Sequence, residues 1–143
     1  MNARRIGELS FGIYASADYL RTRSAPTSVA DLEKTDYVGL AGGDNLPQIA
    51  EMRELAPQLA PGISVDCILL QAQTVALGFG YAPLPDYLTV SFPDLVKILP
   101  DALSRKADVW VLSQPDFSGS ASVKATMNAL VSAAQAALPQ ERS

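Results

Sequence analysis

Short apolar runs that are typical of strands alternate with helix-like segments along almost the whole chain. The runs are rich in Val, Ile, Leu, Tyr and Phe, and turns containing Gly or Pro separate them from the helices. This alternation predicts an α/β fold of three layers, with helices on both faces of a largely parallel sheet. Strands are expected at Leu9–Ala15, Tyr37–Leu40, Ile63–Asp66, Tyr81–Leu84 and Ala107–Leu112, with Leu95–Leu99 extended.

Helices are expected between these strands, wherever a capping residue precedes a segment of helical spacing. A side-chain oxygen at the N-cap accepts hydrogen bonds from free amides of the first turn, and Gly or Pro ends the helix. The predicted helices are Ala17–Thr22 capped by Ser16, Ser28–Lys34 opened by a Ser28–Asp31 capping box, a helix capped by Asn45 that carries Pro47 and ends at Ala56–Pro57, Cys67–Leu77 capped by Asp66 and ended by Gly78, a short helix that starts with Pro85–Leu88, and Ser122–Leu138 ended by Pro139.

Size and composition indicate one globular domain. The 143 residues are 48% hydrophobic and 18% charged, so a core can form. The net charge of −4 and the pI of about 4.7 argue against nonspecific nucleic-acid binding by this part. Polar residues, Gly and Pro interrupt the charge-free run Cys67–Pro85, and no apolar segment follows the basic start Met1–Arg5. We therefore expect no membrane partner and no secretory signal.

The sequence contains no histidine, which excludes Ser-His-Asp and Cys-His nucleophiles and every metal site that needs histidine. The single cysteine, Cys67, forms no disulfide within the chain, so we expect a reducing, cytoplasmic location. Glu51 and Glu54 are expected on the polar face of a surface helix, and Asp108 and Asp116 near turns, so no pair of catalytic carboxylates is predicted. We therefore expect no enzyme, no cofactor and no metal site.

Two features leave a chemical alternative open. The glycine-containing loop Ala41–Asn45 precedes a predicted helix and its amides could approach an anion, but it lacks a nucleotide-binding spacing, which favours an ordinary turn. Cys67 stands at a predicted helix N-terminus, where the helix dipole lowers the pKa of a thiol. Because no histidine partner exists, a small, half-buried structural cysteine is the favoured interpretation.

Two stretches of the sequence carry a recognisable pattern. The first reads R-I-G-E-L-S-F-G-I-Y-A-S-A-D-Y-L over Arg5–Leu20 and is followed by a Ser-x-x-Asp-Leu helix at Ser28–Leu32. The second reads G-F-G-Y-A-P-L-P over Gly78–Pro85. The segment Leu95–Pro100, a Val-Trp-Val-Leu strand, Gln114–Asp116 and the terminal helix then follow in order. Over essentially the whole chain, this arrangement resembles LysR-type transcriptional regulators.

The resemblance implies an effector-binding domain, the sensory part of such a regulator. In that family it consists of two α/β lobes with a small-molecule cleft between them, a type 2 periplasmic-binding-protein-like fold. On this mapping, residues 11–112 form the second lobe and residues 1–10 an incoming crossover segment. Residues 113–143 form a return segment and a C-terminal helix that normally packs on the first lobe. We expect a truncated form, because no helix-turn-helix and no complete first lobe are found, so DNA binding would need a domain absent here.

Open α/β sheets bind ligands at the carboxyl ends of their strands, near helix N-termini. The resemblance implies a small, often anionic metabolite as effector. Asp66 stands where the family commonly has Asn, and a carboxylate repels an anion and offers no donor. Helix capping is the alternative role for each of the expected effector-binding residues. These residues are Ala15, Ser16, Leu40, Ala41, Asp66, Cys67, Pro83 and Leu84.

The predicted C-terminal helix carries Val123, Met127, Leu130 and Val131, which need an apolar partner. Self-association is therefore expected. Three functional hypotheses follow: the sensor domain of a LysR-type regulator, a stand-alone truncated ligand-binding or oligomerisation module that pairs with an intact regulator, and a small α/β enzyme. No catalytic constellation supports the third.

Overall fold

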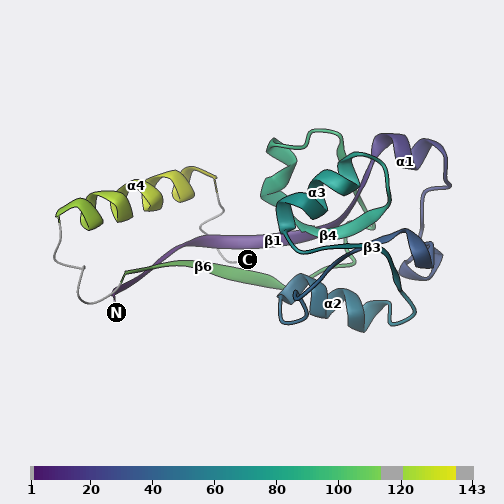
Figure 1. Cartoon of the computed structure of the whole chain (residues 1–143), viewed down its shortest axis with the longest axis horizontal. Coiled ribbons are helices and arrows are strands. Elements are labelled where there is room, and N and C mark those ends of the chain that lie inside the picture. The colour runs from purple at the N-terminus through teal and green to yellow at the C-terminus, as the bar shows by residue number, and fades with distance from the viewer. Residues whose placement is uncertain (1, 114–120, 138–143) are drawn as a thin grey trace. The chain divides into compact units, whose positions relative to one another are not determined.

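The computed structural model describes residues 2–113 and 121–137 (Figure 1). The chain divides into two compact units. One is Ser10–Arg105, and the other combines Met1–Leu9 with Lys106–Ser143.

The larger unit is built on a sheet with strand order β3-β2-β4-β1-β5. Strand β2 pairs in parallel with both β3 and β4, whereas β1 pairs antiparallel with β4 and β5. The strands are β1 Asn2–Ser16, β2 Tyr37–Leu40, β3 Pro61–Val65, β4 Tyr81–Pro85 and β5 Leu95–Ile98.

The α/β class is confirmed, but the parallel prediction holds only for the β3-β2-β4 part of the sheet. The register shows why β1 runs the other way. Ala15 at the end of β1 pairs with Tyr81 at the start of β4, and Tyr81 also pairs with Tyr37 at the start of β2. The connection from β1 to β2 therefore begins and ends at the same end of the strands. Helices α2 and α3 instead carry the chain back across the sheet, which produces parallel strands.

Helices and 3₁₀ turns cover both faces of this sheet, as the prediction of three layers requires. Successive β1 side chains point to opposite faces: Ile13 and Ala15 belong to one buried cluster and Tyr14 to the other. Helix α2 contributes to the first cluster and α3 to the second, so they lie on opposite sides of the sheet (Figure 1). The elements are α1 Ala17–Arg21, η1 Val29–Asp31, η2 Lys34–Asp36, α2 Pro47–Leu55, α3 Ile68–Ala76 and η3 Asp86–Val90.

Two predicted helix starts are confirmed. The Oγ of Ser16 accepts a hydrogen bond from the Tyr19 amide at 3.0 Å, so Ser16 caps α1. The Ser28–Asp31 capping box is present, but it opens only the 3₁₀ turn η1. Leu32 ends this turn because its backbone is extended and its side chain is buried.

Two other caps differ from the prediction by one residue. Leu46, not Asn45, precedes α2, because Pro47 occupies the start of the helix and places the cap at the residue before it. Cys67, not Asp66, is the N-cap of α3, since the Cys67 backbone is still extended and the helix begins at Ile68. Gly78 follows the end of α3 with a φ of 94°, as expected for the glycine that ends a helix.

The smaller unit consists of the first half of β1, β6 (Lys106–Ser113) and α4 (Ala121–Ala137). Strand β6 pairs with β1, and α4 contacts β6. Met127 and Val131 on α4 are buried, whereas Leu130 is half exposed. The predicted helix end at Leu138 and Pro139, and the Gln114–Asp116 segment, lie outside the described residues. None of the described helices has the length and apolar character needed to cross a membrane.

Candidate functional site

Two loops meet at the carboxyl ends of the neighbouring parallel strands β2 and β3. Leu40 pairs with Val65, and the Ala41 amide donates to the Val65 carbonyl at 2.7 Å. The residues that follow these strands therefore lie side by side and line an open hollow of about 390 Å³. Its lining is Leu40, Ala41, Gly42, Gly43, Leu46, Asp66, Cys67, Ile68 and Leu69. Four of the sequence-predicted residues are thus brought together.

The N-terminus of α3 forms one wall of this hollow. Cys67, the N-cap, makes no capping hydrogen bond through its side chain, and its thiol is exposed. First-turn amides and the positive end of the helix dipole favour a negative group. Asp66 at the same wall carries the opposite charge to the helix end. The hollow therefore combines a helix end that attracts anions with a carboxylate that weakens this attraction.

The rest of the wall is apolar or is bare backbone. Leu40, Leu46 and Leu69 present aliphatic side chains, and Leu69 is 57% exposed. Gly42 has a φ of 77°, a left-handed conformation that side chains rarely adopt, and no atom lies within 4 Å of a Cβ placed there. A ligand with an apolar body and a small polar or acidic head matches this lining.

The other four predicted residues lie outside the hollow. Binding at strand carboxyl ends brings residues together only when the strands are parallel, and β1 runs opposite to β2. Ala15 and Ser16 therefore lie at the other edge of the sheet, where Ser16 is 1% exposed and caps α1. Pro83 and Leu84 are buried within β4, so their side chains fill the core.

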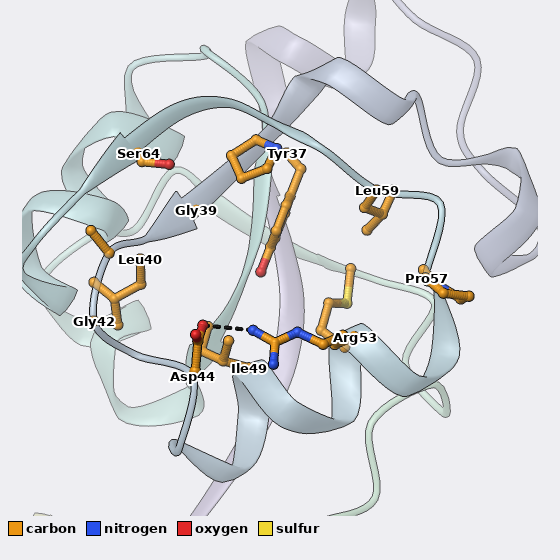
Figure 2. Close-up of a pocket in the computed structure, with 14 residues that line it drawn as sticks. Tyr37, Gly39, Leu40, Gly42, Asp44, Ile49, Arg53, Pro57, Leu59 and Ser64 are labelled. Carbon is orange, nitrogen blue, oxygen red and sulfur yellow. Dashed lines mark hydrogen bonds and ion pairs between the residues drawn. The ribbon is translucent and has the colours of Figure 1, made fainter.

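The structure also contains a second cavity that sequence reasoning did not identify. It has a volume of about 370 Å³ and lies on the α2 side of the Leu40–Asp44 loop (Figure 2). Tyr37, Asp44 and Arg53 supply its charged and phenolic groups, and Arg53 Nη2 donates to Asp44 Oδ1 at 2.6 Å. The available signal was Gly39 within β2, because glycine inside a strand marks a place where something approaches the backbone closely.

The carboxylates expected on a polar helix surface take two different roles. Glu51 is buried and accepts hydrogen bonds from the amides of Ser104 and Arg105. Glu54 remains exposed and pairs with the Arg105 guanidinium. Asp108 accepts from Arg5 Nε at 3.0 Å, and Asp116 lies outside the described residues. Within residues 2–113 and 121–137, no group of three or more acidic or cysteine side chains is arranged to hold a metal ion.

Comparison with known proteins assigns this arrangement to a family. The model of the LysR substrate-binding domain family matches residues 1–135. The fold is similar to the regulatory domain of CrgA, a LysR-type regulator from Neisseria meningitidis, with 18% identity, a TM-score of 0.76, and coverage of 92% of this chain and 68% of that one. A second CrgA structure gives 18% identity and a TM-score of 0.79, and the match covers 93% of this chain but only 47% of that one.

The regulatory domain of an AphB variant from Vibrio vulnificus is also similar, with 18% identity, a TM-score of 0.66, and coverage of 92% of this chain and 70% of that one. A search of curated protein sequences finds no match. At these identities the structural likeness establishes the fold alone. Domains of the matched family bind small-molecule effectors in LysR-type regulators, and those regulators oligomerise. Because the family match covers almost the entire length, the chain belongs to the LysR substrate-binding domain family.

Proposed function

We propose that this chain is the effector-sensing part of a cytoplasmic LysR-type transcriptional regulator, and that the hollow at the ends of β2 and β3 is one wall of the effector site. The convergence of two loops and the α3 N-terminus around that hollow supports the proposal. Residues 11–112 would then be the second lobe, and residues 1–10 and 113–143 the segments that connect it to a first lobe. DNA binding belongs to a helix-turn-helix domain outside this chain.

The lining favours a small metabolite with a carboxylate and an apolar part. The carboxylate would lie at the first-turn amides of α3, and the apolar part against Leu40 and Leu69. Asp66 lowers the affinity for any anion. We expect weak binding by this chain alone, since a lobe without its counterpart encloses only part of a ligand.

A titration of the full ¹⁵N-labelled chain with succinate tests this site, with succinamide as the uncharged control. Succinate should cause saturable shifts in the amide signals of Ala41, Cys67 and Leu69, and succinamide should cause smaller ones. The Ser16 amide lies at the opposite edge of the sheet and serves as an internal reference. Spectra without saturable changes at the α3 N-terminus would refute the proposed effector site.

A second function, as an oligomerisation module, is favoured by the exposed apolar residues of α3 and the turn after it. Leu69, Leu77 and Phe79 are 57%, 69% and 58% exposed. Such a surface drives association when enough apolar area is contiguous. Light scattering after size-exclusion chromatography should show a mass that rises with concentration, and Leu77→Gln should reduce this rise. A constant monomer mass at millimolar concentration excludes this role.

A further inference from the structure

The second cavity is a groove between helix α2 and the edge strand β3. Its floor is β2, and α2 and β3 provide its two long walls (Figure 2). Its volume of about 370 Å³ falls within the usual range for small-molecule pockets, roughly 300–1,000 Å³. The side chains that make the walls apolar are Ile49, Met52, Leu59 and Pro61.

The missing side chain at Gly39 allows β3 to pack closely on β2 along the groove. A Cβ at this position would lie 2.9 Å from Pro61 Cγ and 3.1 Å from Ser64 Oγ. Any larger residue would therefore occupy the space between β2 and β3 or displace the strand. Glycine weakens a strand, and here it lets the Pro61 and Ser64 side chains of β3 pack directly against the β2 backbone.

One end of the groove carries its hydrogen-bonding groups. Figure 2 shows the Tyr37 side chain extending through the cavity, with its oxygen directed toward Asp44 and Arg53. Among the described residues, the Tyr37 hydroxyl has no hydrogen-bond partner, while its ring contacts the Tyr81 ring at a centroid distance of 6.0 Å. Burial raises the pKa of Tyr37 and Asp44 raises it further, although Arg53 acts in the opposite sense. The hydroxyl is therefore protonated at neutral pH and available as a donor.

The charges at this end balance. Arg53 and Asp44 form an ion pair with exposed side chains, so their combined charge is zero. Asp44 would repel an anionic ligand at this end of the groove, and Arg53 would repel a cationic one. A neutral acceptor oxygen can take the hydrogen bond from Tyr37 without breaking the ion pair.

We propose that this groove is a second ligand site, which binds an uncharged ring compound carrying a hydrogen-bond-accepting oxygen. The ring packs between α2 and β3 against Ile49, Met52 and Leu59, and the oxygen accepts from the Tyr37 hydroxyl. The site lies on the α2 side of the Leu40–Asp44 loop, whereas the hollow proposed for the effector lies on the α3 side. Its occupant therefore differs from the effector in both position and charge.

Benzamide is a suitable probe, because it combines a flat ring with a neutral carbonyl oxygen. In a titration of the ¹⁵N-labelled full chain, benzamide should cause saturable shifts of the Gly39 and Arg53 amide signals. Ser64→Leu places an aliphatic side chain in the groove from an exposed position and should abolish these shifts. Tyr37→Phe removes only the donor and should weaken binding about fivefold. Tyr87→Phe, an exposed tyrosine outside the groove, should leave the affinity unchanged.

Benzoate has the shape of benzamide and a negative charge, so it should bind more weakly. Tighter binding of benzoate would overturn the uncharged ligand class. Equal affinity of the wild type and Ser64→Leu for benzamide, or wild-type groove amides that do not shift, would overturn the site itself. Should Tyr37→Phe lose its dispersed spectrum, Ser64→Leu still decides the matter. The succinate titration reports on the other side of the loop, so the two proposals fail independently.

Discussion

The hydroxyl of Tyr14 on β1 donates a hydrogen bond of 2.6 Å to Oδ1 of Asp86, the first residue of η3. Ser10 Oγ donates to the other carboxylate oxygen at 2.8 Å, and Lys97 Nζ on β5 forms an ion pair with Asp86 at 3.1 Å. A single carboxylate thus joins β1, β5 and the end of β4, which lie next to one another in the sheet.

This arrangement predicts an acid-sensitive contribution to stability. Burial opposes ionisation of Asp86, but the hydrogen bonds from Tyr14, Ser10 and Lys97 outweigh it and hold the pKa of the carboxyl below its ordinary value. Because the pKa is lower in the folded than in the unfolded state, the contribution is complete above about pH 4 and is lost as the pH falls through the folded pKa. Urea unfolding of the wild type should show this loss.

Asp86→Asn should lower the free energy of unfolding by about 1–3 kcal/mol at pH 7 and flatten its dependence on pH below about pH 4. Asp101→Asn changes an exposed aspartate and should shift stability by less than about 0.5 kcal/mol. An Asp86→Asn protein as stable as the wild type at pH 7 would show that the network contributes nothing.

Glu51 and Glu54 both lie on α2, so a buried carboxylate and an exposed one can be compared within the same helix. The Glu51 carboxylate accepts from the Ser104 amide, the Ser104 hydroxyl and the Arg105 amide at 2.9–3.0 Å, and it is buried. Glu51→Gln should cost about 1–3 kcal/mol, because it replaces a charged acceptor of several donors. Glu54→Gln breaks a surface ion pair with Arg105 and should cost less than about 1 kcal/mol. Equal losses in chemical denaturation would contradict the role given to Glu51.

The positions of strands follow from the sequence because apolar composition and turn residues are local signals. Tyr37–Leu40 is predicted at its observed bounds, and Ser16 is predicted as the cap that it is. The direction of β1 relative to β2 cannot be predicted from local signals, since it depends on where the chain re-enters the sheet. Nothing local in Leu9–Ala15 records this, so the predicted site residues include Ala15 and Ser16, which lie at the opposite end of the sheet from Leu40 and Ala41.

The contacts of Glu51 and the groove at Tyr37 could not be predicted for a similar reason, because both depend on segments that are distant in the sequence. Glu51 is a charged residue of the kind usually found on the surface. It is buried because the loop at Ser104, 53 residues further along the chain, packs against its carboxylate. The Tyr37 groove is lined in part by Pro61 and Ser64 of β3, a distant segment, so the one local signal, a glycine at position 39 of the strand, does not by itself predict a cavity. By contrast, Leu40–Ala41 and Asp66–Cys67 are correctly grouped, because consecutive parallel strands share an edge.

Replacement by alanine should destabilise the protein far more at Gly80 than at Gly42. A Cβ on Gly80 would lie 1.8 Å from the Asp36 carbonyl oxygen, which is a backbone atom that cannot move alone. Gly80→Ala should therefore cost more than about 3 kcal/mol or prevent folding. Gly42→Ala meets no atom within 4 Å, so only its left-handed backbone opposes the side chain, at about 1 kcal/mol. Thermal unfolding of both variants tests this, and similar melting temperatures would refute the close approach at Gly80.

The effector site makes a prediction about charge at Asp66. This carboxylate lines the hollow beside the α3 N-terminus, where the proposed ligand places its own carboxylate. Two like charges a few ångströms apart at an exposed site repel by about 1 kcal/mol, so Asp66→Asn should strengthen succinate binding about fivefold. Asp18→Asn removes the same charge from α1, beyond the opposite edge of the sheet, and should leave the affinity nearly unchanged.

The dependence of succinate affinity on salt concentration is an independent test of the effect of the Asp66 charge. Calorimetric titration with succinate at low ionic strength should show the full difference between wild type and Asp66→Asn, and added salt should reduce it, because ions screen exposed charges. Succinamide carries no charge and should bind both proteins equally. If Asp66→Asn binds succinate no better than the wild type at low salt, the ligand's carboxylate does not lie at the α3 N-terminus. In that case the hollow would favour an uncharged effector, with its apolar wall around Leu40 and Leu69 making the main contact.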